Sequence, residues 1–219
     1  MRVWLVLSAL CLRISVSTLT ESTDDYDNYD TEEEPTTPAN AATRKPLKQA
    51  PKPEVYDISE FYNTKEKIWV YNTTKRSNET CMVDDIEHTS PINVFMTRYY
   101  FMDGTIKNFT IETDFAVHPG ISDMTSTYNE MQIRIPGYGG PFETLMMLGE
   151  KNDCGVFYVN YHGNQLPGPH DWFELRLRNS SLEKGPDQKC SQRFNEVTLL
   201  QPVTFNYSSV CQCIFRLRT

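Results

Sequence analysis

The segment Cys154-Gly-Val-Phe-Tyr-Val159 has the β-branched and aromatic residues typical of a strand. Trp172-Phe-Glu-Leu175 has the same character, with a carboxylate in its middle. Cys190, the segment Arg193-Phe-Asn-Glu196 and Cys211 follow in that order. This ordered series in the C-terminal third of the chain determines how we interpret the segments before it.

Strand-like runs with turn residues between them fill most of the chain from residue 68 onward. We expect eight: Ile68–Thr73, Cys81–Glu87, Ile92–Phe101, Thr105–Phe115, Thr127–Ile135, Phe142–Leu148, Cys154–Asn160 and Trp172–Arg178. Asp57–Tyr62 predicts a short helical turn, Lys184–Thr198 a helix, and Val203–Phe215 an extended return along the barrel. This pattern favours an all-β sandwich or an up-and-down barrel with one helix after the last strand.

The order and spacing of Ile68-Trp69, Cys81, Cys154, the aromatic-Glu-Leu strand and Cys190 before Phe-Asn-Glu resemble the tick salivary lipocalins, the histamine-binding group and its relatives. The resemblance covers about residues 55–215. It implies an eight-stranded up-and-down lipocalin barrel with a short N-terminal helix and a C-terminal α-helix. It also implies a secreted protein that sequesters a small ligand and is not an enzyme.

Export is predicted independently by the first residues of the chain. Residues 1–17 combine a positive start, a short apolar core and small residues for cleavage, so we expect a signal peptide. Five Asn-X-Ser/Thr sites agree with secretion, and we expect several to carry glycans: Asn72, Asn78, Asn108, Asn179 and Asn206.

Of the six cysteines, five remain once Cys11 leaves with the signal peptide. Two bridges and one spare thiol allow fifteen pairings, and spacing alone does not choose among them. The resemblance implies Cys81–Cys211 and Cys154–Cys190. Cys213 is then free, and in an extended segment it would point the same way as Cys211. The sequence therefore allows bridge swapping or a disulfide-linked dimer of an otherwise monomeric protein.

Residues 18–54 predict a disordered arm before a lipocalin domain at 55–219, because they contain almost no large aliphatic side chains. Eight carboxylates and no basic residue lie between Glu21 and Glu34, so the formal charge of −8 comes mainly from this arm. Tyr26 and Tyr29 lie among these carboxylates and are sulfation candidates. The barrel has no basic stripe, which argues against a nucleic-acid partner, and no later segment is apolar enough to span a membrane.

The resemblance also implies a set of ligand-binding residues inside the barrel: Glu66, Trp69, Glu112, Ile133, Ile135, Phe142, Glu174 and Arg176. Inward carboxylates would neutralise an ammonium group, and aromatic faces would add cation–π attraction. Ile133, Ile135 and Arg176 stand where the relatives have aromatic residues. Thr144 aligns with a pocket aspartate, with a one-residue ambiguity. These departures disfavour histamine and favour an apolar or anionic ligand such as a lipid mediator or sterol.

The sequence therefore supports two functions. The first is a salivary lipocalin that sequesters a host mediator, either a biogenic amine or a leukotriene or sterol, to suppress inflammation or haemostasis. The second is an immunomodulator or anticoagulant that binds a basic host protein through residues 18–34. We expect no cofactor and no metal, because the four histidines lack ligand spacing and no nucleophile or phosphate-binding motif occurs.

Overall fold

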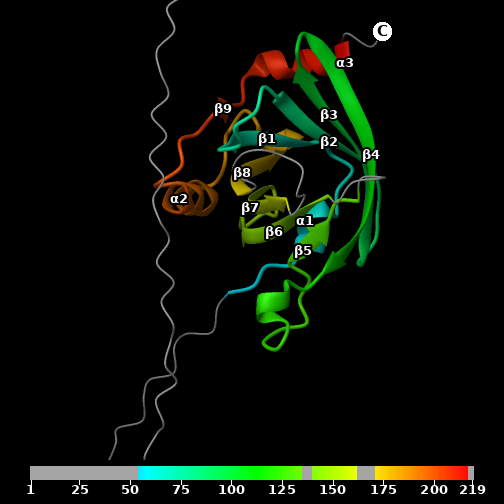
Figure 1. Cartoon of the computed structure of the whole chain (residues 1–219), viewed down its shortest axis with the longest axis vertical. Coiled ribbons are helices and arrows are strands. Elements are labelled where there is room, and N and C mark those ends of the chain that lie inside the picture. Colours follow the sequence, from blue (N-terminus) through cyan, green and yellow to red (C-terminus); the bar gives the residue numbers. More distant parts are fainter. Residues whose placement is uncertain (1–53, 135–139, 162–170, 217–219) are drawn as a thin grey trace, which may run out of the picture. The chain divides into compact units, whose positions relative to one another are not determined.

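The computed structural model of the chain describes residues 54–134, 140–161 and 171–216. These residues form a closed barrel of eight antiparallel strands, with helices at one end and on the outside (Figure 1). The strands are β1 Ile68–Thr73, β2 Thr80–Thr89, β3 Asn93–Met102, β4 Thr105–Ala116, β5 Glu130–Gln132, β6 Pro141–Leu148, β7 Cys154–Tyr161 and β8 Asp171–Arg178. The expected fold class is confirmed.

Consecutive strands pair with one another from β2 to β8, and β1 closes the barrel by pairing with both β8 and β2. The closing contact with β2 is short, because only Ile68 and Trp69 have partners on that strand. The register of β1 against β8 shifts between Val70 and Asn72. Beyond this bulge, β1 pairs with the two-residue strand β9, Phe205–Asn206.

Alternating residues explain which faces of the strands are buried. On β4, Ile111, Thr113 and Phe115 are buried, whereas Glu112 and Asp114 between them are exposed. The β3–β4 register runs without a shift along this hairpin. Its turn is formed by Asp103 and Gly104, whose φ angles of 49° and 77° match the two left-handed positions of a type I′ hairpin.

Helix α1, Ile58–Tyr62, closes one end of the barrel. Asp57 caps it by accepting a hydrogen bond from Ser59 N at 2.9 Å. Ile58, Phe61 and Tyr62 are fully buried, and the rings of Phe61 and Phe157 lie 5.2 Å apart between centroids. The apolar side chains that follow a capping aspartate therefore become the plug of the barrel.

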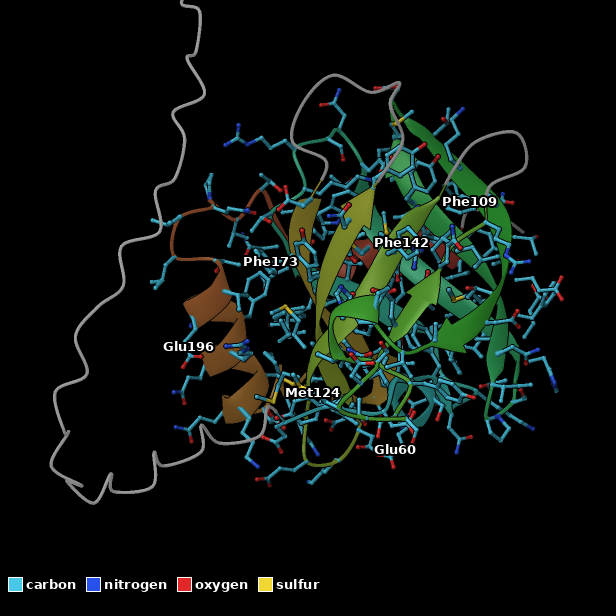
Figure 2. The ribbon with its side chains drawn as sticks, turned by 60° about the horizontal axis from the view of Figure 1, so that its bottom comes forward. Glu60, Phe109, Met124, Phe142, Phe173 and Glu196 are labelled. Carbon is cyan, nitrogen blue, oxygen red and sulfur yellow. A yellow bond between two sulfur atoms is a disulfide. The ribbon has the colours of Figure 1, made fainter. Side chains whose placement is uncertain are left out.

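Helix α2, Gln188–Val197, packs on the outside of β7 and β8. Its buried residues Cys190 and Phe194 contact the outward side chains of these strands, and Figure 2 shows Phe173 beside the helix. Cys154–Cys190 links the helix to the barrel, and Cys81–Cys211 links β2 to the C-terminal segment. Both predicted disulfides are confirmed, and no helix of the described residues is long and apolar enough to cross a membrane.

Two sequence-based expectations differ from the structure. Of the described residues in the strand predicted over Thr127–Ile135, Glu130–Gln132 form a strand, because the residues before them turn back after the 3-10 helix Pro119–Ile121. Only two residues of Val203–Phe215 form a strand. The rest of that segment includes the 3-10 helix Ser209–Gln212 and helix α3, Cys213–Arg216.

Helical backbone at the end of the chain separates the two neighbouring cysteines. Cys211 is buried against Trp69 and Tyr99, whereas Cys213 is exposed. Residues two apart share a face only in extended backbone, so the expectation that both cysteines point the same way is wrong. The predicted signal peptide, Tyr26, Tyr29 and nearly all of the acidic arm lie outside the described residues.

Candidate functional site

The barrel contains a cavity of about 940 Å³ at the end opposite α1. Its apolar lining comes from Met82, Tyr100, Phe109, Ile133, Pro141 and Trp172. In Figure 2, Phe109 on β4 lies toward this end of the barrel, whereas Glu60 on α1 lies toward the other. Tyr100 and Phe109 face each other across the β3–β4 hairpin at 6.3 Å between ring centroids. The cavity is therefore an aromatic pocket inside the barrel.

Five buried charged side chains from four strands form the floor below this cavity, and we call them the charged floor. They are Asp84 on β2, Arg98 on β3, Glu143 on β6, and Glu174 and Arg176 on β8. All are at most 5% exposed. Their side chains meet across the inside of the barrel because each occupies an inward position of its strand.

Arg98 joins two carboxylates of the charged floor. Its Nε and Nη2 donate to the two oxygens of Asp84 at 2.6 and 2.9 Å. Its Nη1 donates to Glu143 Oε1 at 2.7 Å. This fork geometry uses the planar guanidinium fully, as a buried ion pair requires.

Arg176 completes the charged floor on the other side of the barrel. It donates from Nη1 to Glu143 Oε2 and from Nε to Glu174 Oε2, the latter at 2.8 Å. The same Nη1 donates to the hydroxyl oxygen of Tyr62 at 2.8 Å, and the guanidinium carbon lies 4.4 Å from the centre of the Phe157 ring. The charged floor therefore rests on the aromatic plug formed with α1.

Burial and ion pairing oppose each other at Glu143. Burial alone would raise the pKa of this carboxyl, but Arg176 and Arg98 outweigh it and lower the pKa from 4.5 to about 2. Burial likewise favours the neutral form of both arginines, yet the neighbouring carboxylates raise the pKa of each guanidinium well above its ordinary value. Burial raises the pKa of Tyr62, so its hydroxyl is neutral. Glu143 and both guanidiniums are therefore ionised at neutral pH.

By formal charge, the charged floor holds three carboxylates against two guanidiniums, an excess of one negative charge. Glu174 and Arg98 reach the cavity wall. Glu174 Oε1 also accepts a hydrogen bond from the indole nitrogen of Trp172 at 2.6 Å, which fixes the plane of that ring above the charged floor. The excess charge thus lies directly beneath an oriented aromatic platform.

Three of the predicted ligand-binding residues lie in the cavity wall or directly below it. Glu174 and Ile133 line the cavity, and Arg176 lies in the charged floor one layer below. Phe142 is half-buried on β6, on the opposite face from the inward Glu143, and does not line the cavity. Ile135 lies outside the described residues.

The other three predicted residues lie away from the cavity. Glu112 is on the exposed face of β4, although Phe109 of the same strand lines the cavity. Trp69 is fully buried, but it faces outward against Tyr207 and Phe215, and its indole nitrogen donates to Asn179 at 3.0 Å. Glu66 accepts a hydrogen bond from Ser180 N at 2.8 Å near the closed end.

Sequence reasoning missed Asp84, Arg98 and Glu143. Their signal was the strand alternation itself: Arg98 continues the inward series of Val94 and Met96, and Asp84 precedes the inward Ile86 by two. Glu143 resolves the one-residue ambiguity after Phe142, because it rather than Thr144 points into the barrel. The interior therefore retains a carboxylate at this place.

The mouth of the cavity carries a second ion pair. Lys75, in the loop after β1, pairs with Glu79 across the turn of that loop. Its ammonium nitrogen also lies 4.9 Å from the centre of the Trp172 ring. Lys75 and Glu79 both line the cavity. The indole N–H of Trp172 is therefore directed to Glu174 of the charged floor, whereas the ammonium group of Lys75 lies over the face of the ring.

The five predicted glycosylation sites differ in their surroundings. Asn78 and Asn108 are exposed near the cavity mouth, and Asn72 and Asn206 face each other and are hydrogen-bonded across the β1–β9 pair. Asn179 accepts the hydrogen bond from Trp69. Among the described residues, the close group of metal-ligand type is Cys154, Asp187 and Cys190, whose two sulfurs are joined in a disulfide.

No protein-family model and no curated protein matches the chain. Among solved structures, the crystal structure of the AM182 serotonin complex is similar, with a TM-score of 0.52 at 15% identity over 74% of this chain and 97% of that one. The fold is a lipocalin-type barrel. The siderocalin Ex-FABP, described as functioning through dual ligand specificities, also matches at 5% identity, with a TM-score of 0.44 over 64% of this chain and 85% of that chain.

Acid should weaken this barrel through Glu143. Because its folded-state pKa of about 2 lies below the ordinary 4.5, its ionisation stabilises the folded state above pH 4.5. That contribution, about 3 kcal/mol, should be lost as the pH falls from about 5 to about 2. Urea unfolding across this range measures it, and Glu143→Gln should flatten the pH dependence. The exposed Glu112→Gln serves as the control, and an equal flattening in both variants would contradict the assignment.

Proposed function

We propose that the protein is a secreted carrier that sequesters a small organic cation with an aromatic or apolar body, and that it acts by binding without turnover. The observation that carries this proposal is the excess negative charge of the charged floor beneath an aromatic cavity. In keeping with the resemblance to tick salivary lipocalins, the ligand would be a host mediator of the biogenic amine class.

The size and lining of the cavity support a small ligand. Its volume of about 940 Å³ lies within the range of about 300–1,000 Å³ in which small-molecule pockets fall. Aromatic and aliphatic side chains supply the apolar part of its wall, and polar and charged side chains around them, among them Glu79, Asp171 and Glu174, could orient a ligand. Binding of this kind derives its affinity from apolar burial and its selectivity from the charged groups.

The charge of the floor favours a cation over an anion. Arg176 alone would suggest a site for a carboxylate, but its donors are directed to Glu143, Glu174 and Tyr62. The charge that remains uncompensated is negative, and it acts in a region of low dielectric constant. The sequence favoured an anionic ligand because Thr144 aligned with a pocket aspartate, which would remove one carboxylate from the interior. Glu143 supplies a carboxylate at this place, so that argument no longer holds.

Sequestration rather than catalysis is supported by the composition of the cavity wall. No histidine or cysteine is among the described residues that line it. Both oxygens of Glu174 are already hydrogen-bonded, to Trp172 and Arg176. A general base needs an available acceptor within reach of its substrate, so Glu174 is suited to fixed electrostatic stabilisation of a bound ligand.

The proposal predicts selectivity for charge at constant ligand shape. Serotonin and tryptamine should bind at least about tenfold more tightly than indole-3-propionate, because one favourable charge interaction is worth about 1.5–3 kcal/mol. Isothermal titration calorimetry on protein secreted from eukaryotic cells measures this difference. Asp171→Asn, in the cavity wall, should weaken amine binding several-fold, whereas Asp123→Asn, on an exposed turn at the other end, should not. Tighter binding of the carboxylate would refute the proposal.

A further inference from the structure

Lys75 holds its ammonium group where a cationic ligand would be expected to bind. The ammonium nitrogen lies 4.9 Å from the centre of the Trp172 ring and pairs with Glu79. The side chains of Lys75 and Glu79 are only 25% and 21% exposed, so both are largely withdrawn from water. A cation over the face of a tryptophan is attracted by the ring quadrupole, whether it belongs to the protein or to a ligand.

The backbone around Lys75 is fixed. Its N–H donates to Thr73 Oγ1 at 3.0 Å, and its carbonyl accepts from Thr204 Oγ1 at 2.6 Å. Thr74 is bound in turn to Gln201 through its hydroxyl at 2.9 Å. The loop is thus anchored to the 201–204 segment, and the ammonium can leave the Trp172 face by rotation of its own flexible side chain.

The Trp172 ring is fixed as well. Its indole nitrogen donates to Glu174, which Arg176 holds from the other oxygen. The ring therefore presents the same face to the cavity mouth whether Lys75 or another cation lies over it. Glu79 would remain beside this face as a carboxylate if Lys75 moved away.

We infer that Lys75 is an internal competitor of the ligand. In the free protein its ammonium occupies the Trp172 face and the Glu79 carboxylate, and a bound cation displaces it into solvent and takes over both contacts. This inference rests on the proposed function. It makes Lys75 a determinant of selectivity. A small hydrated cation would gain only the contact with the Trp172 ring and the ion pair with Glu79 that Lys75 loses. A cation with an aromatic body also gains from apolar burial.

The test is the affinity of the full secreted chain for serotonin, measured by calorimetry. Lys75→Gln should bind serotonin about tenfold more tightly than the wild type, since the competing cation–π contact and ion pair are removed. Lys151→Gln makes the same change of charge on an exposed residue of the β6–β7 turn, beside α1 at the other end of the barrel, and should leave the affinity unchanged. Unchanged or weaker binding by Lys75→Gln, with the wild type still binding, would overturn this inference and leave the proposed function intact.

A second measurement follows Lys75 directly. In acetylation with acetic anhydride read out by peptide mapping, Lys75 of the free protein should react more slowly than the exposed Lys151. Adding N,N,N-trimethyltryptamine, which has no amine to acetylate, should accelerate the reaction of Lys75 alone. An unchanged Lys75 rate with this ligand bound would exclude displacement. Failure of serotonin and the trimethyl analogue to bind either the wild type or Lys75→Gln would overturn the proposed function together with this inference.

Discussion

Arg176→Met should destabilise the barrel by about 3–5 kcal/mol, the range measured when one partner of a buried ion pair is removed. The guanidinium is 1% exposed and pairs with both Glu143 and Glu174. Its loss leaves three buried carboxylates with only Arg98 to compensate them. Urea unfolding at pH 7, followed by tryptophan fluorescence, measures the change in the free energy of unfolding.

Two variants separate charge from packing at this place. Arg134→Met, whose side chain is 72% exposed, changes the same residue type and should cost less than about 0.5 kcal/mol. The double variant Arg176→Met with Glu174→Gln removes one charge of each sign, so its loss should be smaller than the sum of the two single losses. Additive losses would show that the two side chains act independently and that the charged floor is not a coupled network.

Replacing Cys81 and Cys211 together by serine should cost about 5 kcal/mol, more than replacing the other disulfide. The bridge spans 130 residues, nearly the whole barrel, so its loss returns the most conformational freedom to the unfolded chain. It also frees the C-terminal segment that covers Trp69 and Tyr99. Chemical unfolding under non-reducing conditions measures this loss.

The second disulfide provides the comparison. Cys154–Cys190 spans 36 residues, so replacing this pair by serine should cost about 4 kcal/mol on the same chain-entropy reasoning. The order of the two losses is the informative result. A larger loss for Cys154–Cys190 would show that the attachment of α2, rather than closure of the long loop, dominates the stabilisation.

Local sequence patterns predicted the strands well because each strand is determined by its own alternation and its flanking turns. The predicted bounds of β1 agree with the structure at both ends, and most others differ by one or two residues. The C-terminal segment was predicted poorly for a physical reason. Its residues pack singly onto the outside of the barrel, so neither a period of two nor a helical period develops in Val203–Phe215.

The site was harder to predict than the fold. Glu112 and Phe109 are three residues apart, and on a strand without a bulge such residues point to opposite faces, so they could not both line the cavity. Asp84 and Arg98 were overlooked because charged residues are usually on the surface. Their burial depends on partners from other strands, and the pairing of Arg98 with Glu143 joins residues 45 apart in the sequence.

The bulge in β1 has a consequence for how these molecules behave toward one another. Where β1 turns away from β2, its backbone amides and carbonyls would form an open edge, and open edges are templates for strands of other molecules. Strand β9 occupies this edge at Asn72 and Thr73, and Tyr207 N donates to Tyr71 O at 2.7 Å just beyond it. The C-terminal segment therefore covers this edge of β1, and we expect it to oppose edge-to-edge pairing between molecules.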